Sequence, residues 1–173
     1  LQGYLPYMRL ADIYLMYAEA VAAIAPNVSA LKSRTDYCSL SAVDAINALR
    51  DRVNTADWPM EHVQANLMDT REHFIDEVRR ERAVELSFEG FRWCDLQRWL
   101  LLTEPPYTVK YSHEFERLEK DTWFKTHDPK DAKIGNFHKK ELITRDFDAK
   151  HYWFPLPDKD TYLYEGFPQN PGW

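Results

Sequence analysis

The sequence predicts an all-α protein, and three observations lead to this prediction. Residues 7–25 form a long apolar stretch without Gly or Pro, residues 41–53 form a capped amphipathic stretch, and residues 70–88 continue a helical period. The remainder lacks sustained periodicity. We therefore predict helices joined by long irregular loops, followed by an extended C-terminal tail rich in proline and aromatic residues.

The first predicted helix, residues 7–25, is apolar nearly all round, which is typical of a helix packed on several sides. Pro26 and Asn27 end it. Its few polar residues share one narrow stripe, because Arg9, Asp12 and Glu19 follow at spacings of three and seven. We expect this stripe to face partners within the fold.

The second predicted helix begins at Ser41, where Ser41 and Asp44 have the spacing of a capping box, and continues to about Val53. Arg50 lies on its inner face among aliphatic residues, which are Val43, Ile46, Leu49 and Val53. The first two helices would form an antiparallel hairpin, the unit from which tetratricopeptide-like solenoids are stacked. The sequence shows no clear repeat period.

The third predicted helix starts after Asp69 or Thr70 and ends at Phe88, just before Gly90. Its apolar face consists of Phe74, Ile75, Val78 and Leu86. Arg82, Glu85 and Glu89 fall on the same face. Because a charge inside an apolar stripe is costly unless it is paired, this pattern predicts a specific network of partners.

A second charged amphipathic run follows at residues 91–102, where Arg92, Asp95 and Arg98 recur every three residues before Pro105 and Pro106. We interpret five residues of the two runs as a structural ion network: Arg82, Glu85, Glu89, Arg92 and Asp95. The alternative is a general acid and base pair of a glycoside hydrolase. Arginines at helical spacing argue against it, because they keep a carboxylate ionised instead of raising its pKa.

Residues 107–150 are charged and aromatic without a sustained period, so we predict loops with short helical pieces around residues 112–120. A loop region this long is usually functional or flexible. Its flat rings are candidates for stacking on a sugar, with packing inside the loop as the alternative: Tyr107, Tyr111, Trp123 and Phe124. The tail, residues 152–173, holds four prolines and can form only extended segments and one short helix after Asp158.

Composition excludes several function classes. A net charge of -6 without a large basic patch argues against nucleic-acid binding. The six histidines are dispersed and no Gly-rich phosphate loop exists, so we expect no metal site and no cofactor. Cys38 and Cys94 match no metal spacing and are either free thiols or one disulfide. No apolar run approaches the roughly 20 residues of a membrane span.

Four stretches together resemble the C-terminal part of proteins of the SusD/RagB family. They are YMRLADIYLMYAEA at 7–20, AINALRDR at 45–52, RRERAVELSFEGFRWCDLQRW at 79–99 and FPLPDKDTYLYEGFPQNPGW at 154–173. The ER, EL, FEG, R and D elements keep the family's spacing, and FPLP and QNPGW keep its order. Each stretch alone would be a weak signal, but their order is specific.

The resemblance implies a single helical C-terminal domain over residues 1–173, with the N-terminal part of the protein upstream. Within it, the variable region 102–150 would contribute to ligand choice or to transporter contact. Such proteins are cell-surface lipoproteins of the outer membrane, held by an N-terminal lipid anchor that would lie outside this chain. They are not enzymes; they capture oligosaccharides, or in some members peptides, for a TonB-dependent SusC-like transporter. A helical-repeat scaffold for protein partners is the alternative function, and an enzyme is a third interpretation.

Overall fold

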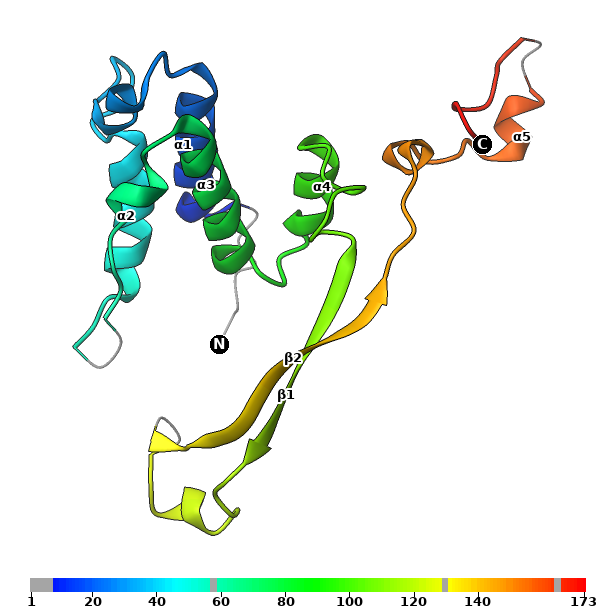
Figure 1. Cartoon of the computed structure of the whole chain (residues 1–173). Helices are drawn as coiled ribbons and strands as arrows, with labels where there is room; N and C mark the ends of the chain where they lie inside the picture. The colour runs from blue at the N-terminus through cyan, green and yellow to red at the C-terminus, as the bar shows by residue number, and fades with distance from the viewer. Residues whose placement is uncertain (1–7, 57–58, 129–130, 164–165) are drawn as a thin grey trace, which may run out of the picture. The chain divides into compact units, whose positions relative to one another are not determined.

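The computed structural model describes residues 8–56, 59–128, 131–163 and 166–173. The chain divides into two compact units, Leu1–Arg92 and Trp93–Trp173. The first unit is helical, whereas the second contains a long antiparallel hairpin (Figure 1).

Three helices build the first unit: α1 (Leu10–Ile24), α2 (Ala42–Val53) and α3 (Arg71–Glu85). α1 contacts both α2 and α3, and the three run side by side in Figure 1. The core between them is formed by fully buried side chains that include Ala18, Ala22, Leu31, Ile46, Phe74 and Val78. The helices predicted at 7–25 and 41–53 are therefore confirmed.

The starts of α2 and α3 follow from local hydrogen bonds. The Ser41 hydroxyl accepts from the Asp44 amide at 3.0 Å and the Asp44 carboxylate accepts from the Ser41 amide at 3.2 Å, which confirms the predicted capping box. These bonds hold the pKa of Asp44 below its ordinary value. At α3, the Thr70 hydroxyl accepts from the His73 amide at 3.1 Å. Thr70 is thus the cap.

α3 ends at Glu85, three residues before the predicted end at Phe88. The chain turns immediately afterwards, with φ of 64° at Phe88 and 86° at Gly90. A positive φ is costly for a residue with a side chain, but Gly adopts it freely. The turn therefore ends at the glycine that the sequence singled out.

The segment between α2 and α3 runs along α2. Side chains of α2 and of its C-terminal cap bond its backbone, because Asn47 accepts from the Val63 amide and Asn54 from the Met60 amide, both at 2.9 Å. Val63 and Met68 enter the core of the first unit. Short 3₁₀ helices lie between α1 and α2 at Val28–Lys32 and before α3 at Ala65–Leu67.

The second unit contradicts the all-α prediction. After α4 (Phe91–Arg98), strands β1 (Val109–Arg117) and β2 (Ile134–Thr144) pair antiparallel, from Val109 opposite Thr144 to Arg117 opposite Ile134. The loops and helical pieces predicted for residues 112–120 are therefore wrong. The fold is a mixture of α and β: mostly helical, with a two-stranded hairpin.

Two features obscured the hairpin in the sequence. Most side chains of both strands are exposed, so neither face of the hairpin is buried against a core. The register also shifts twice, between Lys110 and Tyr111 and between Glu114 and Glu116, which interrupts the pairing. The connection between the strands contains a 3₁₀ turn, Trp123–Lys125, instead of a tight two-residue turn.

The tail folds back on itself through amide side chains. Gln169 accepts from the Leu156 amide at 2.7 Å and donates to the Leu156 carbonyl at 2.8 Å. Trp173 donates from Nε1 to the carbonyls of Lys150 (3.1 Å) and Trp153 (3.0 Å). The short helix predicted after Asp158 is confirmed as α5 (Asp158–Thr161), and a 3₁₀ turn precedes it at Ala149–Tyr152.

Candidate functional site

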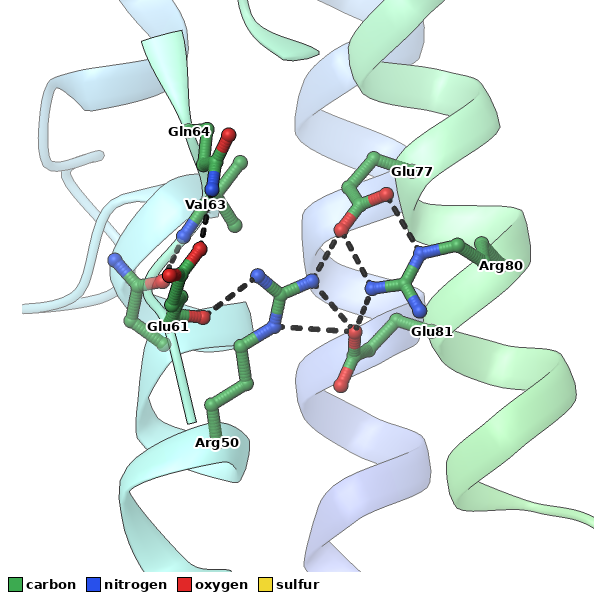
Figure 2. Close-up of polar contacts among 8 residues, drawn as sticks. Arg50, Glu61, Val63, Gln64, Glu77, Arg80 and Glu81 are labelled. Atoms are coloured by element: carbon green, nitrogen blue, oxygen red, sulfur yellow. Dashed lines mark hydrogen bonds and ion pairs between the residues drawn. The ribbon is translucent and has the colours of Figure 1, made fainter. Parts of the chain in front are cut away.

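An ion cluster joins α2 to α3 and is here called the Arg50 cluster (Figure 2). It consists of the buried Arg50, Glu77 and Glu81 and the exposed Arg80. Arg50 bonds both carboxylates, with Nη2 at 2.8 Å from Glu81 Oε2. Its Nη1 donates to the carbonyl of Glu61 at 3.0 Å. One guanidinium therefore ties α2, α3 and the segment between them together.

The carboxylates of the Arg50 cluster are suited to pairing and not to proton transfer. Burial alone would raise the pKa of Glu77, but hydrogen bonds from Arg80 and Arg50 outweigh burial and hold that pKa below its ordinary value. Glu77 and Glu81 are 4% and 6% exposed. A general acid needs a carboxyl that stays protonated, and the two arginines favour the ionised form of Glu77.

The charges predicted on the apolar face of the third helix find partners in α1 and in Arg9, the N-cap residue of α1. Arg82 donates from Nη1 to Asp12 Oδ1 at 2.8 Å, and both residues are buried. The Arg9 guanidinium donates one hydrogen bond to Glu85 at 2.9 Å and two to Glu89 at 2.6 and 3.0 Å. The bonds to Glu89 and Glu85 raise the pKa of Arg9. The polar stripe predicted on the first helix thus faces α3 at Arg9 and Asp12.

Arg52 of α2, which was not predicted as a member of the ion network, also bonds Glu85, at 2.7 Å. Asp95 is buried in the second unit and pairs with Arg98 at 2.9 Å. Arg92 is exposed.

Sequence reasoning did not name Glu77 and Glu81 as members of an ion network. The available signal was Arg50, since an arginine among the aliphatic residues of α2 requires carboxylate partners. Helical spacing could not tell which of the many glutamates of the third helix would reach it.

The predicted stacking residues lie on and beside the hairpin. Tyr111 belongs to β1, Trp123 and Phe124 lie in the connection between the strands, and Tyr107 precedes β1. Tyr111 stands six positions before the end of β1, so about 20 Å of strand separates it from the connection. Trp123 and Phe124 meet edge to face, with centroids 5.2 Å apart. The four residues therefore do not form a single cluster.

Three of these rings carry a basic side chain or an imidazole over one face. Lys139 Nζ lies 3.6 Å from the centroid of Tyr111, and Arg117 lies 5.7 Å from that of Phe124. His127 stacks on Trp123 with centroids 4.4 Å apart and planes at 7°. A ligand could use only the opposite face of each ring, or would have to displace the covering group.

The basic partners of these rings were not predicted, because Lys139 stands 28 positions after Tyr111 in the sequence. Only the strand pairing brings such residues together. The alternation of Val109, Tyr111, His113 and Phe115 with polar residues was the signal that could have revealed β1.

Within the described ranges, no helix is both long and apolar enough to cross a membrane. The same residues contain no group of three or more His, Cys, Asp or Glu side chains that could hold a metal ion.

The chain is similar in structure to a SusD-like protein from Bacteroides fragilis that was solved by crystallography. The TM-score is 0.60 at 21% sequence identity, and the match covers 94% of this chain but 25% of that protein's chain. The chain therefore spans about a quarter of the length of its structural relative. At this identity the match shows a shared fold. No curated protein matches the chain.

The family model for the SusD family matches residues 2–173, nearly the whole chain. This match agrees with the order of the sequence motifs and with the structural relative. The chain belongs to the SusD family.

Proposed function

We propose that this chain forms part of a nutrient-capture protein that binds oligosaccharides at the cell surface and delivers them to a TonB-dependent SusC-like transporter. Peptides are the second ligand class. The protein would be an outer-membrane lipoprotein whose lipid anchor lies outside residues 1–173. The SusD family match over residues 2–173 is the observation that carries this proposal.

The proposed activity is binding without catalysis. SusD family proteins are non-catalytic binding proteins, so the prediction that this chain is not an enzyme agrees with its family. The chemistry of the helical unit supports this view, because Glu77, Glu81, Glu85 and Glu89 each bond at least one arginine.

Within this function, the rings of the hairpin are the proposed ligand contacts: Tyr107, Tyr111, Trp123 and Phe124. Sugar rings present C–H faces that pack on flat aromatic surfaces, and a tyrosine or tryptophan ring adds a polar atom at its edge. Tyr111 is 38% exposed, and Trp123 and Phe124 are half-buried, which leaves part of each ring accessible. The structural ion network of the helical unit would hold the scaffold and would not touch the ligand.

Binding measurements on the whole protein test these contacts. Trp123→Ala and Tyr111→Ala should each lower the affinity for the bound oligosaccharide about 5-fold to 150-fold, the range expected when a ligand loses one aromatic stacking partner worth about 1–3 kcal/mol. Isothermal titration calorimetry measures the affinity, and circular dichroism checks that each variant folds.

Tyr37→Ala is the matched control, because Tyr37 is 99% exposed and lies in the helical unit, outside the proposed contacts. It should leave the affinity unchanged. If both variants bind the oligosaccharide as tightly as the wild type does, Trp123 and Tyr111 do not contact the ligand.

A further inference from the structure

The imidazole of His138 on β2 faces a hydrogen-bond acceptor at each of its two nitrogens. Nδ1 lies 2.9 Å from the carbonyl oxygen of Asn136, and Nε2 lies 3.0 Å from Glu114 Oε2. A neutral imidazole carries a single N–H and can satisfy only one of these acceptors. The geometry therefore fits the protonated ring, which donates both bonds.

These two bonds span an irregular point in the hairpin. Glu114 and His138 are paired across the strands, and the register shifts directly after them, since Glu116 is opposite Gly135. β2 thus uses one residue more than β1 at this point, which is a β-bulge. Asn136 lies inside the bulge with φ of 48°. His138 connects the carbonyl within the bulge to the opposite strand.

The bulge also fixes which side chains appear on the other face of the hairpin. Phe137 and Lys139 flank His138 and point to the opposite face. There Phe137 stacks on His113 with centroids 5.3 Å apart, and Lys139 lies over Tyr111. A slip of β2 by one residue would exchange the two faces and dismantle these contacts.

We propose that His138 is a proton-dependent clasp of the hairpin: its protonated ring fixes the bulge of β2 and thereby holds Tyr111, His113, Phe137 and Lys139 in one row. Loss of the proton removes one of the two bonds and loosens the bulge. A two-stranded hairpin is only marginally stable in water, so a single local contact can decide whether its register is kept. The proposal concerns the hairpin itself and stands whether or not the row contacts a ligand.

The charges around the clasp set its pH window. The bond to the Asn136 carbonyl and then the bond to Glu114 raise the pKa of His138 above its ordinary value of 6.5, against the effect of Lys140. Lys140, 3.0 Å from Glu114 Oε1, and then His138 lower the pKa of Glu114 below 4.5. Glu116 is the next carboxylate on this face of β1 by strand alternation.

The direction of the pH effect follows from these shifts. A raised histidine pKa means that the clasp contributes fully below pH 6.5 and is lost as the pH rises through the pKa of the folded state. A lowered glutamate pKa means that its contribution is present above pH 4.5 and is lost on further acidification. The clasp is therefore complete between these limits, in mildly acidic solution.

Histidine-selective ¹⁵N NMR of the chain between pH 4 and 9 tests the clasp. In the wild type, His138 should titrate above the ordinary histidine value, and Glu114→Gln should move its midpoint down. Glu141→Gln is the matched control, because Glu141 bonds the Thr144 hydroxyl and not His138. The control should leave the His138 midpoint in place. An ordinary midpoint in the wild type, or equal midpoints in all three proteins, would overturn the proposal.

Amide hydrogen exchange supplies a second, independent readout. After correction for intrinsic rates, the amides of residues 112–116 and 136–140 should lose at least threefold of their protection as the pH rises through the His138 midpoint. His138→Gln should remove this pH dependence, while Glu141→Gln should keep it. Protection that is equal on both sides of the midpoint in the wild type would show that His138 does not clasp the hairpin.

Discussion

Arg50 and Glu77 are each about 95% buried. A buried charge is tolerated here because each residue forms an ion pair with the other. Removing one member of a buried pair leaves the other uncompensated, which typically costs about 3–5 kcal/mol. At the scale of residues, the stability of the helical unit therefore depends on a few specific pairs: Arg50 with Glu77 and Glu81, and Arg82 with Asp12.

Arg50→Ala should lower the free energy of unfolding by about 3–5 kcal/mol, because it leaves two buried carboxylates with fewer cationic partners. Urea denaturation followed by circular dichroism measures this change. Arg71→Ala is the matched control, since Arg71 is exposed and pairs with the exposed Glu72, and it should cost less than about 1 kcal/mol. An Arg50→Ala variant as stable as the control would contradict the structural role of the cluster.

The stability of the chain should also depend on Glu77 in a pH-dependent way. Because its pKa is lowered in the folded protein, the ionised form contributes stability above the ordinary value of 4.5, and this is lost as the pH falls through the folded-state pKa. Glu77→Gln should therefore be clearly less stable than wild type at pH 7, and the difference should shrink below pH 4.5. Glu72→Gln, at an exposed position, should show a small and nearly constant difference. Urea denaturation at each pH measures both; a gap for Glu77→Gln that stays constant down to pH 3 would refute this explanation.

The helices of this chain could be predicted from local sequence more readily than its strands. α1 and α2 could be predicted because an apolar stretch without Gly or Pro, and a Ser41 to Asp44 cap, have local physical causes. The hairpin could not be recognised in the same way, since its strands bury little apolar surface and pair across a connection of 16 residues. Local sequence specifies the caps of helices and their apolar faces. Which strands pair, and which carboxylate an arginine bonds, depends on residues far away in the sequence.

The same distinction applies to the candidate site. Tyr111, Trp123 and Phe124 could be named because the sequence predicts an irregular segment there, in which flat rings can be exposed. The groups over their faces, Lys139, His127 and Arg117, are set by the hairpin and the local turn. Arg50 and Arg82 indicated that partners existed, but not which carboxylates they would be.

Ser41→Ala tests the contribution of a single cap to an element. The variant removes the hydroxyl that accepts from the Asp44 amide, so the free energy of unfolding should fall by about 1 kcal/mol. Ser39→Ala, at a nearby exposed position before the helix, should change it by less than about 0.5 kcal/mol. Thermal denaturation monitored by circular dichroism compares the two. Equal melting temperatures for both variants would show that the capping box is not needed for α2.

At the scale of the whole molecule, the chain combines a helical unit held by buried ion pairs with a unit built on a long exposed hairpin. It spans about a quarter of its structural relative, so capture of a nutrient is proposed for the whole protein. The ion pairs favour a rigid scaffold, and the hairpin rings favour ligand contact. The functional proposal itself is based on the SusD family match over residues 2–173.

The most direct test is calorimetric titration of the whole protein with a panel of oligosaccharides and peptides, followed by mass spectrometry of the recovered ligand. An oligosaccharide should bind, Trp123→Ala should weaken this binding, and the ligand should be recovered uncleaved. A protein that binds no member of the panel, or that returns cleaved products, would contradict non-catalytic nutrient capture.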